Sequence, residues 1–336
     1  MLLSSRRRTN EPRHGSASWL RRSGLSTLVA VALGVFAGAA QAQSPCPSQS
    51  IHPEIYRWEL DAQGKGVYLC RAKDGYGNFK HITVQVVDLA AGAKMRIMSE
   101  VAPGSPIGTS ETLFVKRTAQ EWYNWIKLGN ATVPPIAQLF SVTSGSFTMP
   151  TAAATAHLSF AEKKWGIITT TGNDPVCYYM DDGSSAKRMF GLSDPRAAGQ
   201  QFAAIRPFDV ACQAGATPVN NAFSGYFDAL VGFHPLYGDA TRRTNRSFIG
   251  SKRKDGAWAE GKDQDVVYLL TSTTPTSPMP ALTLNEAHKI LANDFGAQWT
   301  VQLAGGGDAQ YFHQGFEDPS PNKVPVPEVL VVYQAP

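Results

Sequence analysis

The feature that most constrains the fold of this chain is a series of short segments with the two-residue period of β-strands. Residues 79–89 (FKHITVQVVDL) give the clearest case, because they alternate well and are rich in β-branched side chains. We expect turns at residues 61–66 and 90–94, and the least regular structure at residues 174–229, which are rich in Gly, Ala and Asp. The other predicted strands are residues 55–60, 66–72, 95–101, 138–144, 266–272, 299–303 and 329–333.

Two helices are marked by capping boxes. Thr118 precedes Glu121 by three residues, and Thr283 precedes Glu286 in the same way, so each pair can satisfy two backbone N–H groups at a helix start. Gly296 supplies a stop signal for the second helix. The apolar face of the first helix, expected to be core and not a sugar-stacking platform, is Trp122, Trp125 and Ile126, and that of the second is Leu284, Ala287, Leu291 and Phe295.

The order of these elements indicates the fold class. Strands and helices mix without a regular βαβ rhythm, so we expect an α+β fold with mixed β-sheets and a few flanking helices. Residues 43–53 are rich in Pro and Ser and read as a tether. We therefore expect a tether and β-hairpin over residues 43–78, followed by the main domain over residues 79–336.

The first 42 residues have the pattern of an export signal. Arginine-rich sequence precedes an apolar run from Leu25 to about Ala40, and Ala40-Gln41-Ala42 forms a small-x-small cleavage site. The run is shorter than the roughly 20 residues that cross a bilayer. We expect a cleaved signal peptide, no stable membrane anchor after cleavage and a periplasmic or extracellular protein; a retained anchor is the alternative.

Charge is concentrated in the same leader. The sequence holds 31 Lys and Arg and 27 Asp and Glu, but its first 42 residues contain six Arg, no Lys and one Glu. Residues 43–336 thus hold 25 basic and 26 acidic side chains. Nucleic-acid-binding proteins normally need a basic surface. We therefore expect no nucleic-acid partner, a local basic patch aside.

Four cysteines follow the leader, and an even number in an exported chain indicates disulfide bonds. None lies in a C-x-x-C motif, which disfavours redox and zinc-ribbon roles. Of the three pairings, we favour Cys46 with Cys70 and Cys177 with Cys212, because each pair is nearest in sequence. One bridge with two buried thiols is the alternative.

Matches to common catalytic motifs are incomplete. Residues 256–262 (GAWAEGK) match the first seven positions of a P-loop, but Asp263 occupies the place of the magnesium-binding Ser or Thr. We expect this segment to be a hairpin loop. His288 stands alone on the second predicted helix, where a histidine is more often a surface or packing residue than a ligand. The sequence specifies neither a cofactor nor a metal.

Four short motifs occur in order along the second part of the chain. They are residues 139–147 (LFSVTSGSF), 230–236 (LVGFHPL), 245–250 (NRSFIG) and 295–308 (FGAQWTVQLAGGGD). Together they resemble the N-G-G-F-F, G-G-x-P-x-L, R-T-A-I-G and G-A…L-D-G-G-G-S motifs of the phosphodiester glycosidase family. The resemblance extends from about Phe79 to the C-terminus. It implies an exported glycosidase-like protein that hydrolyses a sugar-1-phosphodiester or a related envelope glycan.

The resemblance also implies a set of site residues. An arginine offers a planar fork of donors to phosphate, and a glycine turn lets backbone N–H groups approach an anion closely. Glycosidic cleavage needs a general acid or base, commonly a carboxylate. The predicted substrate-binding residues are Arg246, Ser144, Gly145, Gly305, Gly306 and Gly307, and the predicted catalytic residues are Asp308 and His234.

Two departures from the motifs bear on catalysis. Ala304 occupies the position of the family's Asp, and Ser144 replaces an Asn. Asp308 follows four residues after Ala304, where the family has Ser. Either Asp308 takes over proton transfer, or the domain binds a glycan or phosphodiester without cleaving it.

Each proposed site residue also has a purely structural interpretation. Arg246 could form a surface ion pair, the glycines a tight turn, and His234 and Asp308 ordinary loop positions. If the structure scattered these side chains instead of placing them around one cleft, a structural protein with an unknown partner would be favoured.

Overall fold

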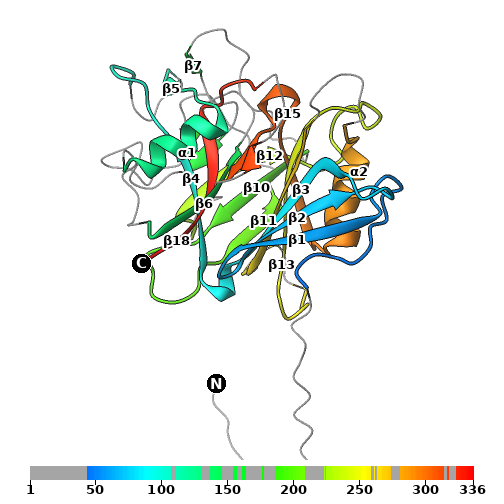
Figure 1. Cartoon of the computed structure of the whole chain (residues 1–336). Coiled ribbons are helices and arrows are strands. Elements are labelled where there is room, and N and C mark those ends of the chain that lie inside the picture. The colour runs from blue at the N-terminus through cyan, green and yellow to red at the C-terminus, as the bar shows by residue number, and fades with distance from the viewer. Residues whose placement is uncertain are drawn as a thin grey trace, which may run out of the picture. The chain divides into compact units, whose positions relative to one another are not determined.

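The computed structural model describes most of the chain beyond the leader (Figure 1). Residues 43–336 form one compact unit, and all that follows concerns this unit. The predicted signal peptide lies outside the described residues. These are residues 44–106, 111–129, 136–145, 154–156, 161–163, 176–177, 186–208, 223, 225–258, 261, 263–273, 281–313, 316–317 and 323–336.

The larger sheet contains eleven strands of the described residues. We expected mixed sheets, and in the described residues each pairing between named strands is antiparallel. β8 (Ala161–Lys163) pairs with β12 and with β9 (Val176–Cys177) beside the main path. The strand order of that path is β1 (Arg57–Gly64), β2 (Val67–Lys73), β3 (Phe79–Asp88), β14 (Val266–Ser272), β13 (Arg246–Lys252), β15 (Trp299–Gly305), β12 (Asp228–Phe233), β10 (Lys187–Leu192) and β11 (Ala203–Pro207).

A second sheet faces the first. Its strand order is β17 (Phe316–Glu317), β16 (Tyr311–His313), β6 (Gln138–Ser144), β18 (Glu328–Gln334) and β4 (Ala93–Ser99). A fully apolar cluster lies between the sheets and joins Leu269 and Val301 of the first to Ile97 and Leu330 of the second. A small pair, β5 (Phe114–Val115) with β7 (Thr155–Ala156), stands apart from both sheets.

One helix covers each outer face, which gives the order helix, sheet, sheet, helix (Figure 1). α1 (Ala119–Lys127) packs Trp122 and Ile126 on the smaller sheet, so the prediction that this apolar face is core is confirmed. α2 (Leu284–Lys289) continues as a π-helical turn over Ile290–Asp294 and packs on the larger sheet. The capping boxes at Thr118 and Thr283 both form as predicted.

Two predicted turns form with narrower bounds, and one stretch predicted to be irregular contains strands. β1 continues through Gly64, so the turn expected at residues 61–66 shrinks to Lys65 and Gly66; the polar side chains there belong to an exposed edge strand. β4 begins at Ala93, inside the turn expected at residues 90–94, after a short 3-10 turn at Leu89–Ala91. β10 and β11 lie inside the stretch expected to be irregular, because burial of their apolar side chains compensates for weak strand propensity.

The N-terminal hairpin is continuous with the larger sheet. β2 pairs with β3 along most of its length, and Cys46 forms a disulfide bond with Cys70 of β2. This confirms one of the two predicted bridges. The other stays a prediction, because Cys212 lies outside the described residues. Among the helices that the structure describes, none has the length and apolarity needed to cross a membrane.

A buried ion pair joins the two sheets. Arg96 of β4 donates through Nε to a carboxylate oxygen of Asp228 in β12 at 2.5 Å, and the same oxygen accepts from the backbone N–H of Ile97 at 3.0 Å. Both side chains are almost completely buried. Charges removed from water are retained only where they are paired and hydrogen-bonded, so the pair fixes how β4 lies against β12.

The substitution Asp228→Ala tests this link. It leaves the Arg96 guanidinium buried without its charge partner, and we expect the free energy of unfolding to fall by about 3–5 kcal/mol. Urea denaturation measures the change. Arg253→Ala, which removes an exposed pair with Asp255, is the control and should leave stability nearly unchanged. Equal stability of the Asp228 variant and the wild type would contradict the interpretation.

Candidate functional site

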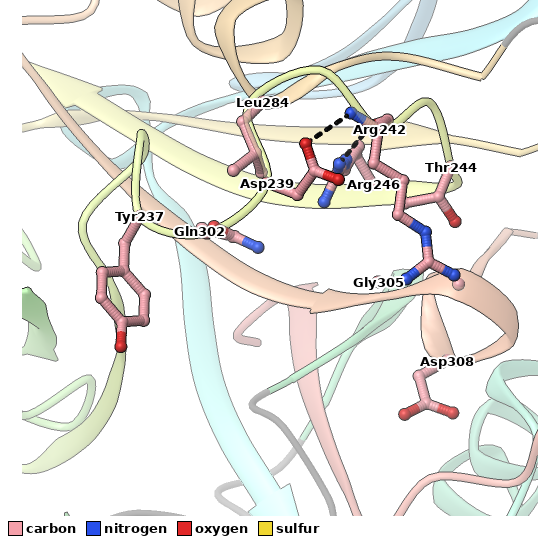
Figure 2. Close-up of a pocket in the computed structure, with 11 residues that line it drawn as sticks. Tyr237, Asp239, Arg242, Thr244, Arg246, Leu284, Gln302, Gly305 and Asp308 are labelled. Atoms are coloured by element: carbon pink, nitrogen blue, oxygen red, sulfur yellow. Dashed lines mark hydrogen bonds between the residues drawn. The ribbon is translucent and has the colours of Figure 1, made fainter.

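A cavity of about 340 Å³ lies where β13 begins and β15 ends (Figure 2). Four of the predicted site residues line it: Arg246, Gly305, Gly306 and Asp308. They meet because Arg246, the first residue of β13, pairs across the sheet with Gly305, the last residue of β15. Antiparallel pairing thus joins two sequence motifs that lie almost 60 residues apart. The loop between β12 and β13 forms the opposite wall.

Two glycines permit this arrangement. A Cβ atom at Gly232 of β12 would overlap the carbonyl oxygen of Gln302 in β15. A Cβ atom at Gly250 of β13 would lie 2.9 Å from that of Ala297. Both glycines belong to motifs that pointed to the site, and their absent side chains let β12, β13 and the segment before β15 approach closely.

Arg246 is buried, and its guanidinium is held by backbone carbonyls. Nε donates to the carbonyl oxygen of Leu282 at 3.1 Å, and Nη2 donates to that of Arg242 at 2.7 Å. Burial, with a smaller contribution from Arg242, lowers its pKa. The salt bridges between described residues do not include Arg246, and the nearby Asp239 only partly offsets the lowering of its pKa. Because Arg246 is buried, the alternative of a surface ion pair is wrong.

Arg242 supplies a second guanidinium, which extends toward Gly305 and Asp308 in Figure 2. Its side chain is exposed. The backbone of this loop is held by Asp239, whose Oδ1 atom accepts from the Thr241 hydroxyl at 2.7 Å and from the Arg242 N–H group at 3.2 Å. The bonds from Thr241 are the main cause of a lowered pKa of Asp239. Asp239 therefore orders the loop as a carboxylate.

The glycine turn continues β15 as a 3-10 turn over Gly306–Asp308. Gly306 has φ of 65°, a backbone conformation that favours glycine, and donates its N–H to the Asn245 carbonyl at 3.0 Å. That N–H group is therefore engaged within the protein. Gly307 does not line the cavity, and its carbonyl accepts from the backbone of Val324 at 3.1 Å.

Ser144 and Gly145 lie behind the turn and do not line the cavity. The Ser144 hydroxyl accepts from the Gln310 N–H group at 3.1 Å and is fully buried. The Gly145 carbonyl accepts from the N–H of Ala304 at 3.4 Å, and a Cβ atom at Gly145 would lie against the side chain of Glu328. These contacts give both residues a structural explanation. Ala304, which replaced the acid in the motif comparison, is itself fully buried.

His234 also stands outside the cavity lining, at the start of the loop that forms its wall. Its Nδ1 atom accepts from the Leu236 N–H group at 3.3 Å. Burial and the nearby Arg188 lower the pKa of His234. His288 of α2 lies with Nδ1 2.9 Å from the Thr300 hydroxyl, and burial, His234 and Lys289 lower its pKa.

Sequence reasoning missed several residues of the lining, chiefly Tyr237, Arg242 and Gln302. Arg242 could have been predicted from the sequence, because it lies four residues before Arg246 in an arginine-rich loop. Gln302 could not have been predicted, since the sequence does not reveal which face of the strand a glutamine occupies. Among the described residues, no group of three or more His, Cys, Asp or Glu side chains could hold a metal ion.

No protein-family model and no curated protein matches this sequence. Remote similarity to solved structures exists. The catalytic domain of zebrafish N-acetylglucosamine-1-phosphodiester alpha-N-acetylglucosaminidase, auto-inhibited by its pro-peptide, has 11% identity and a TM-score of 0.44, over 87% of this chain and 86% of that one. A hypothetical protein from Synechocystis has 12% identity and a TM-score of 0.41, over 82% of this chain and 64% of its own.

A protein described as exported, from Burkholderia pseudomallei, has 11% identity and a TM-score of 0.37, over 76% of this chain and 74% of that one. The chain thus spans less than two thirds of the Synechocystis protein. Such remote similarity assigns no activity. Over the residues that it describes, the structure shows a mostly β fold with two short α-helices.

The lowered pKa values of the two histidines predict their titration. The fold favours the neutral rings, so NMR titration should give midpoints below the ordinary value of 6.5 for both His234 and His288. The unfolded chain then binds more protons, and stability should fall as the pH is lowered below 6.5. His288→Gln should weaken that dependence. Midpoints at or above 6.5 would contradict the prediction.

Proposed function

We propose that this chain is an exported glycosidase that hydrolyses a sugar-1-phosphodiester at the cavity between β13 and β15. The observation that carries the proposal is the convergence of Arg242, Arg246 and Asp308 on one cavity. Residues 43–336 are nearly neutral overall, so an anionic substrate must be attracted by placed groups and not by bulk charge. The leader and the disulfide support export.

The two arginines would contribute to phosphate binding in different ways. Arg246 is buried and tied to two carbonyl oxygens, which makes it a fixed source of positive charge. Arg242 is exposed, and the described residues show no ion pair for it, so its fork of donors is available to phosphate oxygens. A fixed charge beside an adaptable donor suits an anion that enters from solvent.

In the proposed reaction, water attacks the anomeric carbon and Asp308 accepts its proton. The bond between the anomeric carbon and the phosphate oxygen breaks, and the electron pair stays on the phosphate. Arg242 and Arg246 balance that charge, which is why the leaving phosphate needs no separate acid. The products are a free sugar and a phosphomonoester. Asp308 thus takes over the role that Ala304 cannot perform.

The second candidate function is binding without cleavage. It is favoured by Ala304, a fully buried side chain that cannot transfer a proton at the position where the family has its acid. In this case the arginines hold an anionic glycan, and Asp308 contributes only to the shape and charge of the cavity. The two functions share a binding site and differ only in the product that they release.

Hydrolysis of a panel of sugar-1-phosphodiesters, followed by phosphomonoester release, separates the two functions. Asp308→Asn should lower kcat by about 10²–10⁴-fold while ligand affinity is kept, because only proton transfer is lost. Arg242→Ala should raise KM, with Arg253→Ala as the control outside the cavity. Wild-type protein that binds but does not cleave establishes the second function, and wild-type protein that binds no member of the panel contradicts both.

A further inference from the structure

The cavity has a second, uncharged half. Figure 2 places Tyr237 at one end and Asp308 at the other, with Gln302 between Tyr237 and the arginines. Phosphate chemistry uses only the end that holds Arg242 and Asp308. Tyr237 and Gln302 therefore need a separate explanation.

Tyr237 presents an aromatic ring to solvent. Half of its surface is exposed. Its ring stacks on Phe233, with centroids 4.8 Å apart and 28° between the planes. The stacking holds the ring in one orientation while it lines the cavity. A fixed aromatic surface at a cavity wall is a common way to bind the apolar face of a ligand ring.

Gln302 presents an unused hydrogen-bond acceptor. Its side chain is more than nine-tenths buried, and its Oε1 atom has no hydrogen-bond partner within the part of the chain that the structure describes. A buried polar atom left without a partner is costly, and native proteins keep very few. Gln302 lines the cavity, while Oε1 itself is buried beside it, so a rotation of the amide would let a ligand hydroxyl supply the missing donor.

We propose that Tyr237 and Gln302 form a pyranose subsite, in which the ring stacks on Tyr237 and a sugar hydroxyl donates to Gln302 Oε1. This inference rests on the proposed function and adds an orientation to it. The sugar stacks at the Tyr237 end and the phosphate lies at Arg242 and Arg246. The anomeric carbon faces Asp308, so that the attacking water lies between the two.

Two uncleavable probes test the subsite by calorimetry. One is the methyl ester of α-C-glucopyranosylmethyl phosphonate, in which a CH₂ group replaces the glycosidic oxygen. The other is dimethyl phosphate, which has no sugar. Tyr237→Ala should weaken binding of the glucosyl probe about tenfold and leave dimethyl phosphate unaffected. Tyr76→Ala is the matched control, because Tyr76 is 94% exposed on the turn between β2 and β3, outside the cavity lining.

Gln302→Met separates binding from folding. Methionine has a similar shape and no polar group that needs a partner, so the melting temperature should stay the same or rise. Affinity for the glucosyl probe should nevertheless fall about fivefold. A purely structural glutamine would give the opposite pattern, with lower stability and unchanged affinity.

The outcomes distinguish this inference from the proposed function. Tyr237 and Gln302 variants that bind the glucosyl probe as tightly as wild-type protein overturn the subsite alone. Equal losses for both probes overturn it too, since they indicate a general change in the cavity. Wild-type protein that binds neither probe, or an Arg242→Ala protein that binds both as well as wild type, contradicts phosphate recognition and removes the basis of the subsite.

Discussion

The buried pair of Arg96 and Asp228 is the constraint on which the arrangement of the two sheets depends. Apolar side chains fill the space between the sheets, but such contacts are non-directional and tolerate sliding. The charge-assisted hydrogen bond between β4 and β12 prevents such sliding, because a displacement would separate two charges that remain buried. The position of β12 in turn sets where the loop that lines the cavity begins.

The candidate site follows from the register of β13 and β15. Pairing Arg246 with Gly305, beside an irregularity in the register, brings the arginine motif to the glycine turn. A shift of one strand by one residue would turn its side chains to the opposite face. Gly232 and Gly250 are needed for the same arrangement, since a larger residue at either position would push the neighbouring segment away. The glycines of these motifs therefore shape the sheet as much as they shape the cavity.

The cavity combines two kinds of recognition. Its charged end holds two arginines and two carboxylates, of which Asp239 is bonded to its own loop, and its other end holds an aromatic ring and an amide oxygen without a partner. A ligand with a phosphate joined to a sugar would use both ends. In the proposed function, cleavage depends on Asp308, because Ala304 is a buried side chain that cannot transfer a proton.

The sequence alone predicted the two capping boxes, eight of the eighteen strands in the described residues and the motifs that group Arg246, Gly305 and Asp308, and it favoured the Cys46–Cys70 bond, because these depend on local spacing or short motifs. It did not predict β12 and β13 as strands, although both border the cavity. It failed at β10 and β11, whose weak strand propensity is overcome by burial in the core. Tertiary structure alone placed Ser144 behind the turn and brought Tyr237 and Gln302 into the cavity. The physical reason is that strand register and close packing between distant segments decide which face each side chain occupies.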